Sequence, residues 1–336
     1  MRILVFEYIT GGGMLGEAIP RSLAQEGELM LTALLRDLSD LPEIRTIAFR
    51  DVRFPISDRA FSGTDWIFLD RKDDLERCLD DQIEYCDAVW PIAPETGGIL
   101  ERICRRVESA GKTLLASSGD GVSLAASKFE TVKRLEKKGV PAIPTFALNT
   151  STPLEFPLVV KPDDGVGCEG SRILETKSEW QAWVTAIGDP TGYVVQPLVE
   201  GEPLSLSALF CHGKARLLSC NRQRIDRSRG GFSLRGCEVG AIRTSLSAYE
   251  DLANKLAEAL PELWGYVGVD VLRCEQELKV LEVNPRLTTS YAGLRQFLGF
   301  NPAALVLDLW RSGRLPEVHP IAEMAVEIGL ERWDDG

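Results

Sequence analysis

Two neighbouring strand-like segments limit the fold and the chemistry of this chain more than any other feature. The run "GVDVLRC" carries Asp270, and the run "LKVLEVNPR" carries Glu282 and Asn284. Because side chains alternate along a strand, Glu282 and Asn284 face the same side of the sheet. Carboxylate and amide oxygens on adjacent strands suit Mg²⁺, which proteins bind through carboxylates together with nucleotide phosphates. An alternating polar face is the simpler alternative, but it does not explain why Glu-x-Asn-Pro-Arg ends an apolar strand.

A second segment has the composition of a phosphate-binding loop. In "PLVVKPDDGVGCEGSRIL" a strand at Leu158–Val160 leads to Lys161, followed by Gly165, Gly167 and Gly170. Glycines allow positive φ and close backbone approach, so that N–H groups can surround phosphate oxygens, and the lysine supplies a point charge. No G-K-[ST] closes the loop, so it is not a Walker A motif. A mobile hairpin turn stays open as the alternative.

A third segment predicts a connector between two small sheets. In "YVVQPLVEGEPLSLSALF" a strand enters Gln196–Val199 and leaves through Glu200-Gly201-Glu202. Such a connector can offer backbone N–H and C=O groups to an adenine edge, and Glu202 could accept hydrogen bonds from ribose hydroxyls. An acidic hairpin turn explains the segment equally well.

The first third of the chain alternates strand and helix signals, which predicts a parallel, doubly wound sheet. The expected strands are Arg2–Tyr8, Ile44–Phe49, Ala88–Ile92 and Thr113–Leu115, with helices near 20–38 and 97–110. After about residue 125 the chain changes to short runs of β-branched residues, which is typical of an α+β region built on antiparallel sheets.

The opening "FEYITGGGMLGE" satisfies the dinucleotide pattern G-x-G-x-x-G through Gly11, Gly13 and Gly16. A nicotinamide- or flavin-dependent oxidoreductase is therefore an alternative from another class of enzyme. Pro20, however, indicates that the helix begins several residues after Gly16, whereas a pyrophosphate site requires the glycines at the helix N-terminus. The best acidic candidate after the second strand, Asp51, is also too far from the glycines for the ribose role.

Composition excludes several classes of partner and of catalytic site. The net charge of −12 and the lack of a visible basic patch argue against nucleic-acid and anionic-membrane partners. No apolar run is long enough to span a bilayer, and "MRILVF" lacks the features of a signal peptide. Eight cysteines without a C-x-x-C pair are expected to be reduced thiols in a cytoplasmic protein. The two histidines are isolated, which disfavours histidine-centred hydrolysis and histidine-rich metal sites.

Taken in order, these segments resemble the ATP-grasp ligase superfamily. The resemblance implies an α/β pre-ATP-grasp domain at residues 1–118, followed by an α+β ATP-grasp fold whose two antiparallel-sheet subdomains, 119–192 and 193–336, clamp the nucleotide. It implies ATP and Mg²⁺ (or Mn²⁺) as cofactors, with Asp270, Glu282 and Asn284 as metal ligands. The implied nucleotide contacts are Lys128 and Lys161 on the phosphates, the loop Asp164–Ser171 with Gly165, Gly167, Gly170 and Ser171 over the γ-phosphate, Gln196 and Leu198 at adenine, and Glu202 at ribose.

The resemblance also implies the chemistry, in which ATP converts a carboxylate to an acyl phosphate and an amine displaces the phosphate. The candidates for holding the acyl phosphate and an anionic substrate are Arg286, Arg222 and Arg224. D-alanine–D-alanine ligases carry an arginine two residues before the metal Asp, and this chain has Gly268 there, so the role must move elsewhere. For Arg222 and Arg224 a solvated strand face is an equal alternative.

Three strings, "FEYITGGG", "APETGGIL" and "KPDDGVGCEG", resemble the tyramine–L-glutamate ligase family of methanofuran and methylofuran biosynthesis. This implies small-molecule partners: the γ-carboxylate of L-glutamate and the amine of tyramine. The implied substrate side of the cleft consists of Gly11, Gly12, Gly13, Glu95, Thr289, Ser290 and Tyr291, although capping or packing roles also fit them. Another ATP-grasp amino-acid or peptide ligase, a nucleotide-binding regulatory protein and a homodimer are left open.

Overall fold

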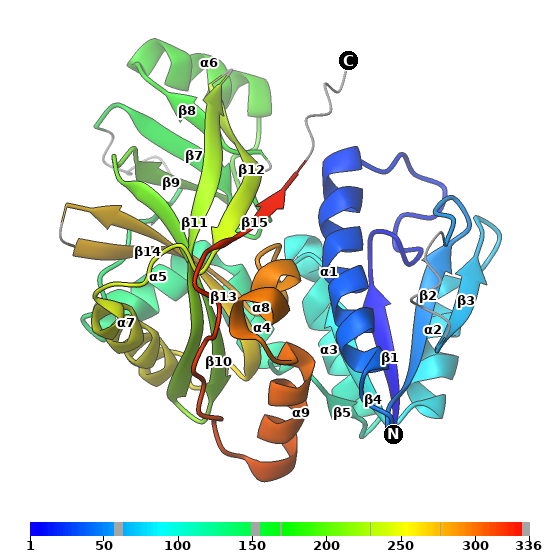
Figure 1. Ribbon diagram of the computed structural model, residues 1–336. Helices are drawn as coiled ribbons and strands as arrows, with labels where there is room; N and C mark the ends of the chain where they lie inside the picture. Colours follow the sequence, from blue (N-terminus) through cyan, green and yellow to red (C-terminus); the bar gives the residue numbers. More distant parts are fainter. Residues whose placement is uncertain (57–62, 149–154, 169, 229, 276, 331–336) are drawn as a thin grey trace.

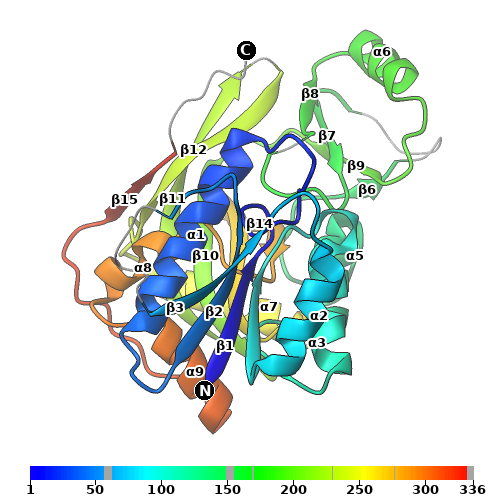
Figure 2. The same ribbon diagram turned by 90° about the vertical axis from the view of Figure 1, so that its right-hand side faces the viewer.

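Three sheets make up the protein in the computed structural model (Figures 1 and 2), which describes residues 1–56, 63–148, 155–168, 170–228, 230–275 and 277–330. The N-terminal sheet is parallel, and the other two are antiparallel. The expected fold class is confirmed. The domain limits at residues 118 and 192 stay predictions.

The N-terminal sheet has the strand order β3-β2-β1-β4-β5. Its strands are β1 (Arg2–Glu7), β2 (Arg45–Asp51), β3 (Thr64–Leu69), β4 (Ala88–Ile92) and β5 (Thr113–Leu114). The helices of this part are α1 (Arg21–Ser39), α2 (Leu75–Tyr85), α3 (Ile99–Ser109) and α4 (Gly119–Ala126), with a 3₁₀ turn η2 (Thr96–Gly98) before α3. The strand order reverses between β1 and β4, and in open α/β sheets ligands bind beyond the carboxyl ends of the strands at such a point.

The local sequence explains these elements. Ile3–Phe6 of β1 is completely buried, as expected for a parallel strand covered on both faces. In α1, Leu31, Leu34, Leu35 and Leu38 are buried at helical spacing. Pro20 directly precedes the helix, so the glycines at 11–16 lie well before its first turn.

The middle sheet has the order β6-β9-β7-β8. It consists of β6 (Phe146–Ala147), β7 (Leu158–Pro162), β8 (Arg172–Leu174) and β9 (Tyr193–Pro197), with α5 (Lys128–Lys137) before it and α6 (Lys177–Ile187) within it. Its own apolar cluster is small and is built around Leu158, Val160, Leu174 and Val195.

The largest sheet has the order β14-β13-β10-β11-β12-β15. Its strands are β10 (Glu202–Cys211), β11 (Lys214–Ser228), β12 (Gly231–Val239), β13 (Gly265–Cys274), β14 (Glu277–Asn284) and β15 (Val326–Gly329). Helix α7 (Leu246–Ala259) packs on one face, while α8 (Tyr291–Leu298) and α9 (Pro302–Ser312) lie between the other face and α1 (Figure 1). The second face therefore looks toward the N-terminal sheet.

Two further properties bear on the expectations from composition. Among the described residues, no helix combines the length and the apolar character that crossing a bilayer requires. All eight cysteines are free thiols in the structure.

Candidate active site

Two buried lysines and one buried glutamate meet where the middle and large sheets approach each other. The Glu282 carboxylate oxygen Oε2 lies 3.6 Å from Nζ of Lys128 and 3.8 Å from Nζ of Lys161. Burial would raise the pKa of Glu282, but the two ammonium groups lower it below its usual value. Burial lowers the pKa of Lys161, and Glu282 opposes that shift. The structure thus brings together three residues that are far apart in sequence.

The other proposed metal ligands lie beside Glu282. Asp270 is the direct cross-strand partner of Glu282, and Asn284 Nδ2 donates to Asp270 Oδ2 at 3.2 Å. Burial and the neighbouring Glu282 raise the pKa of Asp270. Gln223 Nε2 donates to Asp270 Oδ1 at 2.8 Å, a contact that the sequence analysis did not anticipate.

This oxygen set fits a divalent cation bound together with phosphates. Two adjacent buried carboxylates repel each other, and a cation between them would relieve that repulsion. In the described part of the chain no three His, Cys, Asp or Glu side chains are placed to hold a metal ion together, and this set has two carboxylates and one amide. Mg²⁺ is commonly bound through one or two carboxylates, with substrate phosphates completing its coordination.

The glycine loop lies against these lysines. Lys128 Nζ donates to the carbonyl oxygen of Gly165 at 2.5 Å, which ties the start of α5 to the loop. Gly167 and Gly170 have φ values of +57° and +69°, and a Cβ at Gly170 would lie 2.9 Å from the Pro162 ring. Ser171 ends the loop next to β8, whereas Glu169 within it lies outside the described residues. The loop therefore requires glycine for both conformation and space.

Two polar groups of the connector after β9 already form hydrogen bonds within the protein. Gln196 is buried, and its Nε2 donates to Thr145 Oγ1 at 2.8 Å. The backbone N–H of Leu198 donates to the carbonyl oxygen of Pro157 at 3.1 Å. An adenine contact from the N–H of Leu198 would have to compete with this bond, so the adenine assignment stays a prediction.

Glu202 and Arg222 lie away from the metal residues, and the ribose role of Glu202 and the acyl-phosphate role of Arg222 stay predictions. Glu202 pairs across β10 and β13 with Arg273, and Arg222 pairs with Leu204 and Glu238. These positions alternate with Asp270 and face α7, on the opposite side of the sheet. Glu202 Oε1 accepts from Arg222 Nε at 2.8 Å, and Arg273 binds its other oxygen. The Glu202 carboxylate is thus held in an ion-pair network with two arginines.

Arg224 is also directed elsewhere. A β-bulge between Gln223 and Ile225 interrupts the register of β11 with β12. Arg224 Nη2 donates to the carbonyl oxygen of Ile328, and its Nη1 lies 3.6 Å from Glu327 Oε2, both on β15. Its contacts support the edge of the sheet.

Arg286 lies in the cleft and joins the two halves of the molecule. Its guanidinium Nε is 3.0 Å from the Glu95 carboxylate, which follows β4 of the N-terminal sheet. Glu95 is buried and Arg286 is mostly so, and the carboxylates of Glu95, Glu26 and Glu282 raise the pKa of Arg286 against the effect of burial. A permanent cation beside the metal residues can stabilise a developing phosphate charge.

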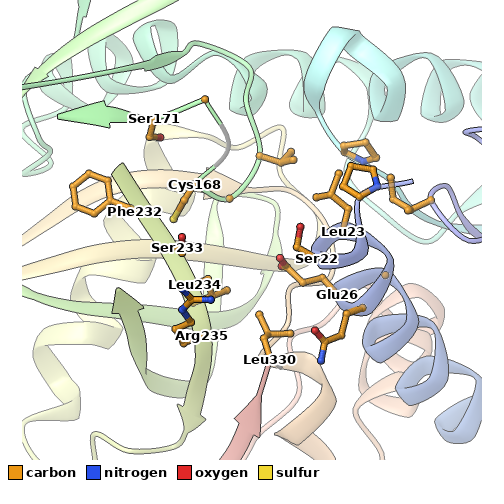
Figure 3. Close-up of a pocket in the computed structure, with 18 of the residues that line it drawn as sticks. Ser22, Leu23, Glu26, Cys168, Ser171, Phe232, Ser233, Leu234, Arg235 and Leu330 are labelled. Carbon is orange, nitrogen blue, oxygen red and sulfur yellow. The ribbon is translucent and has the colours of Figure 1, made fainter. Parts of the chain in front are cut away.

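A large cavity of about 950 Å³ opens next to Arg286 (Figure 3). Its floor comes from the ends of β1 and β4, at the point where the strand order reverses. Helix α1 contributes one wall through Ser22, Leu23 and Glu26, and the glycine loop and β12 contribute the opposite wall. A cavity of this size holds a small-molecule substrate.

The opening glycines are not among the residues that line this cavity, and their role on the substrate side stays a prediction. A Cβ at Gly11 would lie 2.2 Å from the Glu7 carbonyl oxygen, and one at Gly13 would lie 2.5 Å from the Tyr8 ring. Gly12 has a φ of +103° and lies against Leu69 of β3. The three glycines form a tight turn that needs their lack of side chains, and they precede α1 by too many residues to form a dinucleotide site.

The three substrate-contact candidates after β14 lie in different places, one at the cavity wall and two in the core. Thr289 Oγ1 donates to Glu26 Oε2 at 3.0 Å, at the cavity wall. Ser290 instead shares a buried hydroxyl network with Ser207 and Tyr266. Tyr291 is fully buried, and its hydroxyl donates to Asp37 Oδ2 at 2.9 Å. These contacts hold α8 in place, and neither Ser290 nor Tyr291 lines the cavity, so their substrate role stays a prediction.

Comparisons with known proteins agree with this architecture. An ATP-grasp domain family model matches residues 125–290, and a pre-ATP-grasp domain model matches residues 44–122. The chain belongs to the ATP-grasp family, whose members bind ATP together with a divalent cation.

Individual relatives are similar over most of their length. A tyramine–L-glutamate ligase of Methanocaldococcus fervens is 28% identical over 298 residues, which cover 87% of this chain and 89% of that protein. A tyramine–L-glutamate ligase of Methanocaldococcus jannaschii is 26% identical over 87% of this chain and 84% of its own length. A solved ATP-grasp superfamily protein from Archaeoglobus fulgidus superposes with a TM-score of 0.70 at 22% identity, covering 98% of this chain and all of that one.

Proposed function

We propose that this protein is an ATP-dependent carboxylate–amine ligase that joins the γ-carboxylate of L-glutamate to tyramine through an acyl phosphate. The observation that carries the proposal is the cluster of Lys128, Lys161 and Glu282 beside a cavity lined by Arg286. The similarity to tyramine–L-glutamate ligases over most of both chains supports the choice of substrates.

The residues divide into a nucleotide side and a substrate side. Lys128, Lys161 and the glycine loop would hold the ATP phosphates by charge and by backbone N–H groups. Asp270, Glu282 and Asn284 would hold Mg²⁺ or Mn²⁺, which neutralises phosphate charge when bound. Phosphoryl transfer depends on positioning and charge more than on acid–base side chains, which fits a site without histidine.

The reaction has two steps. An oxygen of the glutamate γ-carboxylate attacks the γ-phosphorus of ATP, the bond to the β-phosphate oxygen breaks, and ADP leaves. Arg286 would stabilise the acyl phosphate, because its side chain lies in the cavity and is held by Glu95. The amine then attacks the carbonyl carbon, and inorganic phosphate leaves.

The decisive test is ADP release with ATP and L-glutamate across a panel of amines: tyramine, dopamine, D-alanine and ammonia. We expect tyramine-dependent turnover and a product with the mass of γ-glutamyltyramine. Turnover with D-alanine but not with tyramine would assign another amino-acid ligase activity. Stabilisation against heat by NAD or FAD, without stabilisation by Mg-ATP, would refute the ligase proposal.

A further inference from the structure

Among the acidic side chains that line the large cavity in the described part of the chain, Glu26 has a carboxylate oxygen to which no hydrogen bond is made. Glu7 accepts hydrogen bonds from Ile9 N and from both Thr10 N and Thr10 Oγ1, so its carboxylate is fully used in the turn after β1. Asp226 forms an ion pair with Arg235 at 3.0 Å.

The hydrogen bonding of Glu26 leaves one oxygen available to a ligand. Oε2 accepts from Thr289 Oγ1 at 3.0 Å, and no hydrogen bond reaches Oε1 within the described part of the chain. Oε1 is not among the fully buried side-chain atoms that lack a hydrogen-bond partner, and Glu26 lines the cavity. Oε1 is therefore accessible from the cavity. Figure 3 shows the carboxylate of Glu26 directed from α1 into the space that separates it from Cys168 and Ser233.

Glu26 lies near Arg286 and is hydrogen-bonded to the segment that follows the metal strand. Arg286 lines the same cavity, and its positive charge acts directly on the Glu26 carboxylate. Thr289 follows the metal strand β14 by five residues, so its bond to Glu26 fixes α1 relative to the strand that carries Glu282 and Asn284. Glu26 is therefore next to the cation that would hold the acyl phosphate.

The surroundings of Glu26 also suit an organic ammonium ion. Leu23, Leu234 and Leu330 line the cavity on the elements around it (Figure 3). An apolar wall with one available carboxylate accommodates a primary ammonium group carrying an aryl or alkyl chain.

We propose that Glu26 binds the ammonium group of the amine substrate and accepts its first proton, an inference that rests on the ligase function proposed above. The ammonium loses one proton to the Glu26 carboxylate and becomes a neutral amine. Its nitrogen lone pair forms the C–N bond to the acyl carbon. The bond between that carbon and the bridging phosphate oxygen breaks, and inorganic phosphate leaves with the electron pair. The second N–H proton goes to the leaving phosphate, and Glu26 returns its proton to solvent.

Burial raises the pKa of Glu26, although Thr289 and Arg286 oppose the shift, so the carboxylate is a stronger base than an exposed glutamate. The other titratable or charged groups of the cavity are Glu7 on β1, Cys168 and Arg172 at the glycine loop, Asp226 on β11 and Arg235 on β12. Positioned proton transfer of this kind typically contributes about 10²–10⁴-fold to a rate.

The test compares two nucleophiles in the full-length protein with ATP, Mg²⁺ and L-glutamate. Hydroxylamine is largely uncharged at neutral pH and needs no base to attack the acyl phosphate, whereas tyramine arrives as an ammonium ion. In Glu26→Gln the amide oxygen can still accept from Thr289, so the interface bond is kept. We expect a hydroxamate rate within about twofold of the native protein and a loss of about 100-fold or more in amide formation with tyramine.

Glu28→Gln is the matched control, because Glu28 lies on the same helix and pairs with Arg50 at 2.6 Å away from this cavity. It should leave both rates unchanged. Equal losses of hydroxamate and amide in Glu26→Gln would assign Glu26 to positioning of α1 and overturn the inference, as would native rates with tyramine. Absence of glutamate-dependent hydroxamate in the native protein would instead refute the proposed function, and the inference with it.

Discussion

Glu282→Gln removes the charge at the centre of the lysine cluster while keeping the shape of the side chain. The two ammonium groups lie 3.6 and 3.8 Å from the carboxylate. At an effective dielectric constant of about 20, each attraction is worth about 4–5 kcal/mol. The variant also loses the burial cost of the carboxylate and its repulsion with Asp270, which offset part of that sum. Removing one partner of a buried pair typically costs about 3–5 kcal/mol, and we expect about 3 kcal/mol here.

The expected result has two parts. The unfolding midpoint without ligand should fall by about 6 °C, at about 2 °C per kcal/mol for a chain of this size. The turnover number should fall by about 100-fold or more, since the proposed metal site loses a carboxylate and the two lysines lose the anion that holds them in place. Differential scanning fluorimetry with and without Mg-ATP, and coupled ADP release, measure the two effects.

Glu277→Gln provides the control, because Glu277 lies on the same strand but is exposed, 3.2 Å from Lys279. An exposed pair is worth about 0–1 kcal/mol, so both quantities should stay close to native values. Native turnover in Glu282→Gln would refute the placement of the metal site. A fall in the unfolding midpoint no larger than that of Glu277→Gln would refute the electrostatic reasoning.

Three further predictions test separate parts of the structure. Arg286→Gln should lower the turnover number about 10²–10³-fold while Mg-ATP still stabilises the protein in a thermal shift, and loss of that stabilisation would assign Arg286 to the nucleotide. Glu202→Gln should change KM for ATP by less than about twofold, because its carboxylate is held by Arg222 and Arg273; a rise of about tenfold would support the ribose role. Burial raises the pKa of Asp37 to about 6, so folding retains a proton that the unfolded chain releases, and the free energy of unfolding should fall by about 2 kcal/mol as pH rises from about 4 to about 7. Asp37→Asn should abolish most of that slope in urea titrations at the two pH values, and an unchanged slope would contradict the assignment.

Much of the strand framework could be predicted from sequence because its strands are continuous apolar runs. Ala88–Ile92 and Leu158–Lys161 are almost entirely buried, and composition alone identifies such segments. Helix α2 was missed because its acidic sequence buries only Leu79 and Ile83. Strand β15 was missed because it is held by pairing with β12, more than eighty residues earlier in the chain.

In the site, too, residues in local motifs could be predicted, whereas a residue whose position depends on strand register could not. Lys128, Lys161 and the residues of β13 and β14 were recognised as an ordered set, and the fold brings them together. Gln223 was passed over in favour of the arginines on either side of it. The signal that could have found it was strand alternation, but which face of β11 meets Asp270 depends on the pairing of Leu204 with Arg222, and that register is fixed by the whole sheet.

The chain just after β14 has a consequence for protein engineering. Arg286 pairs with Glu95, Thr289 with Glu26, and Tyr291 with Asp37, so three successive contacts of one short segment end on the N-terminal part. A chimera that takes the first 118 residues from a relative would separate these partners. Grafts between ATP-grasp ligases should therefore transfer residues 286–295 along with the N-terminal part, as one unit made of two distant pieces of sequence.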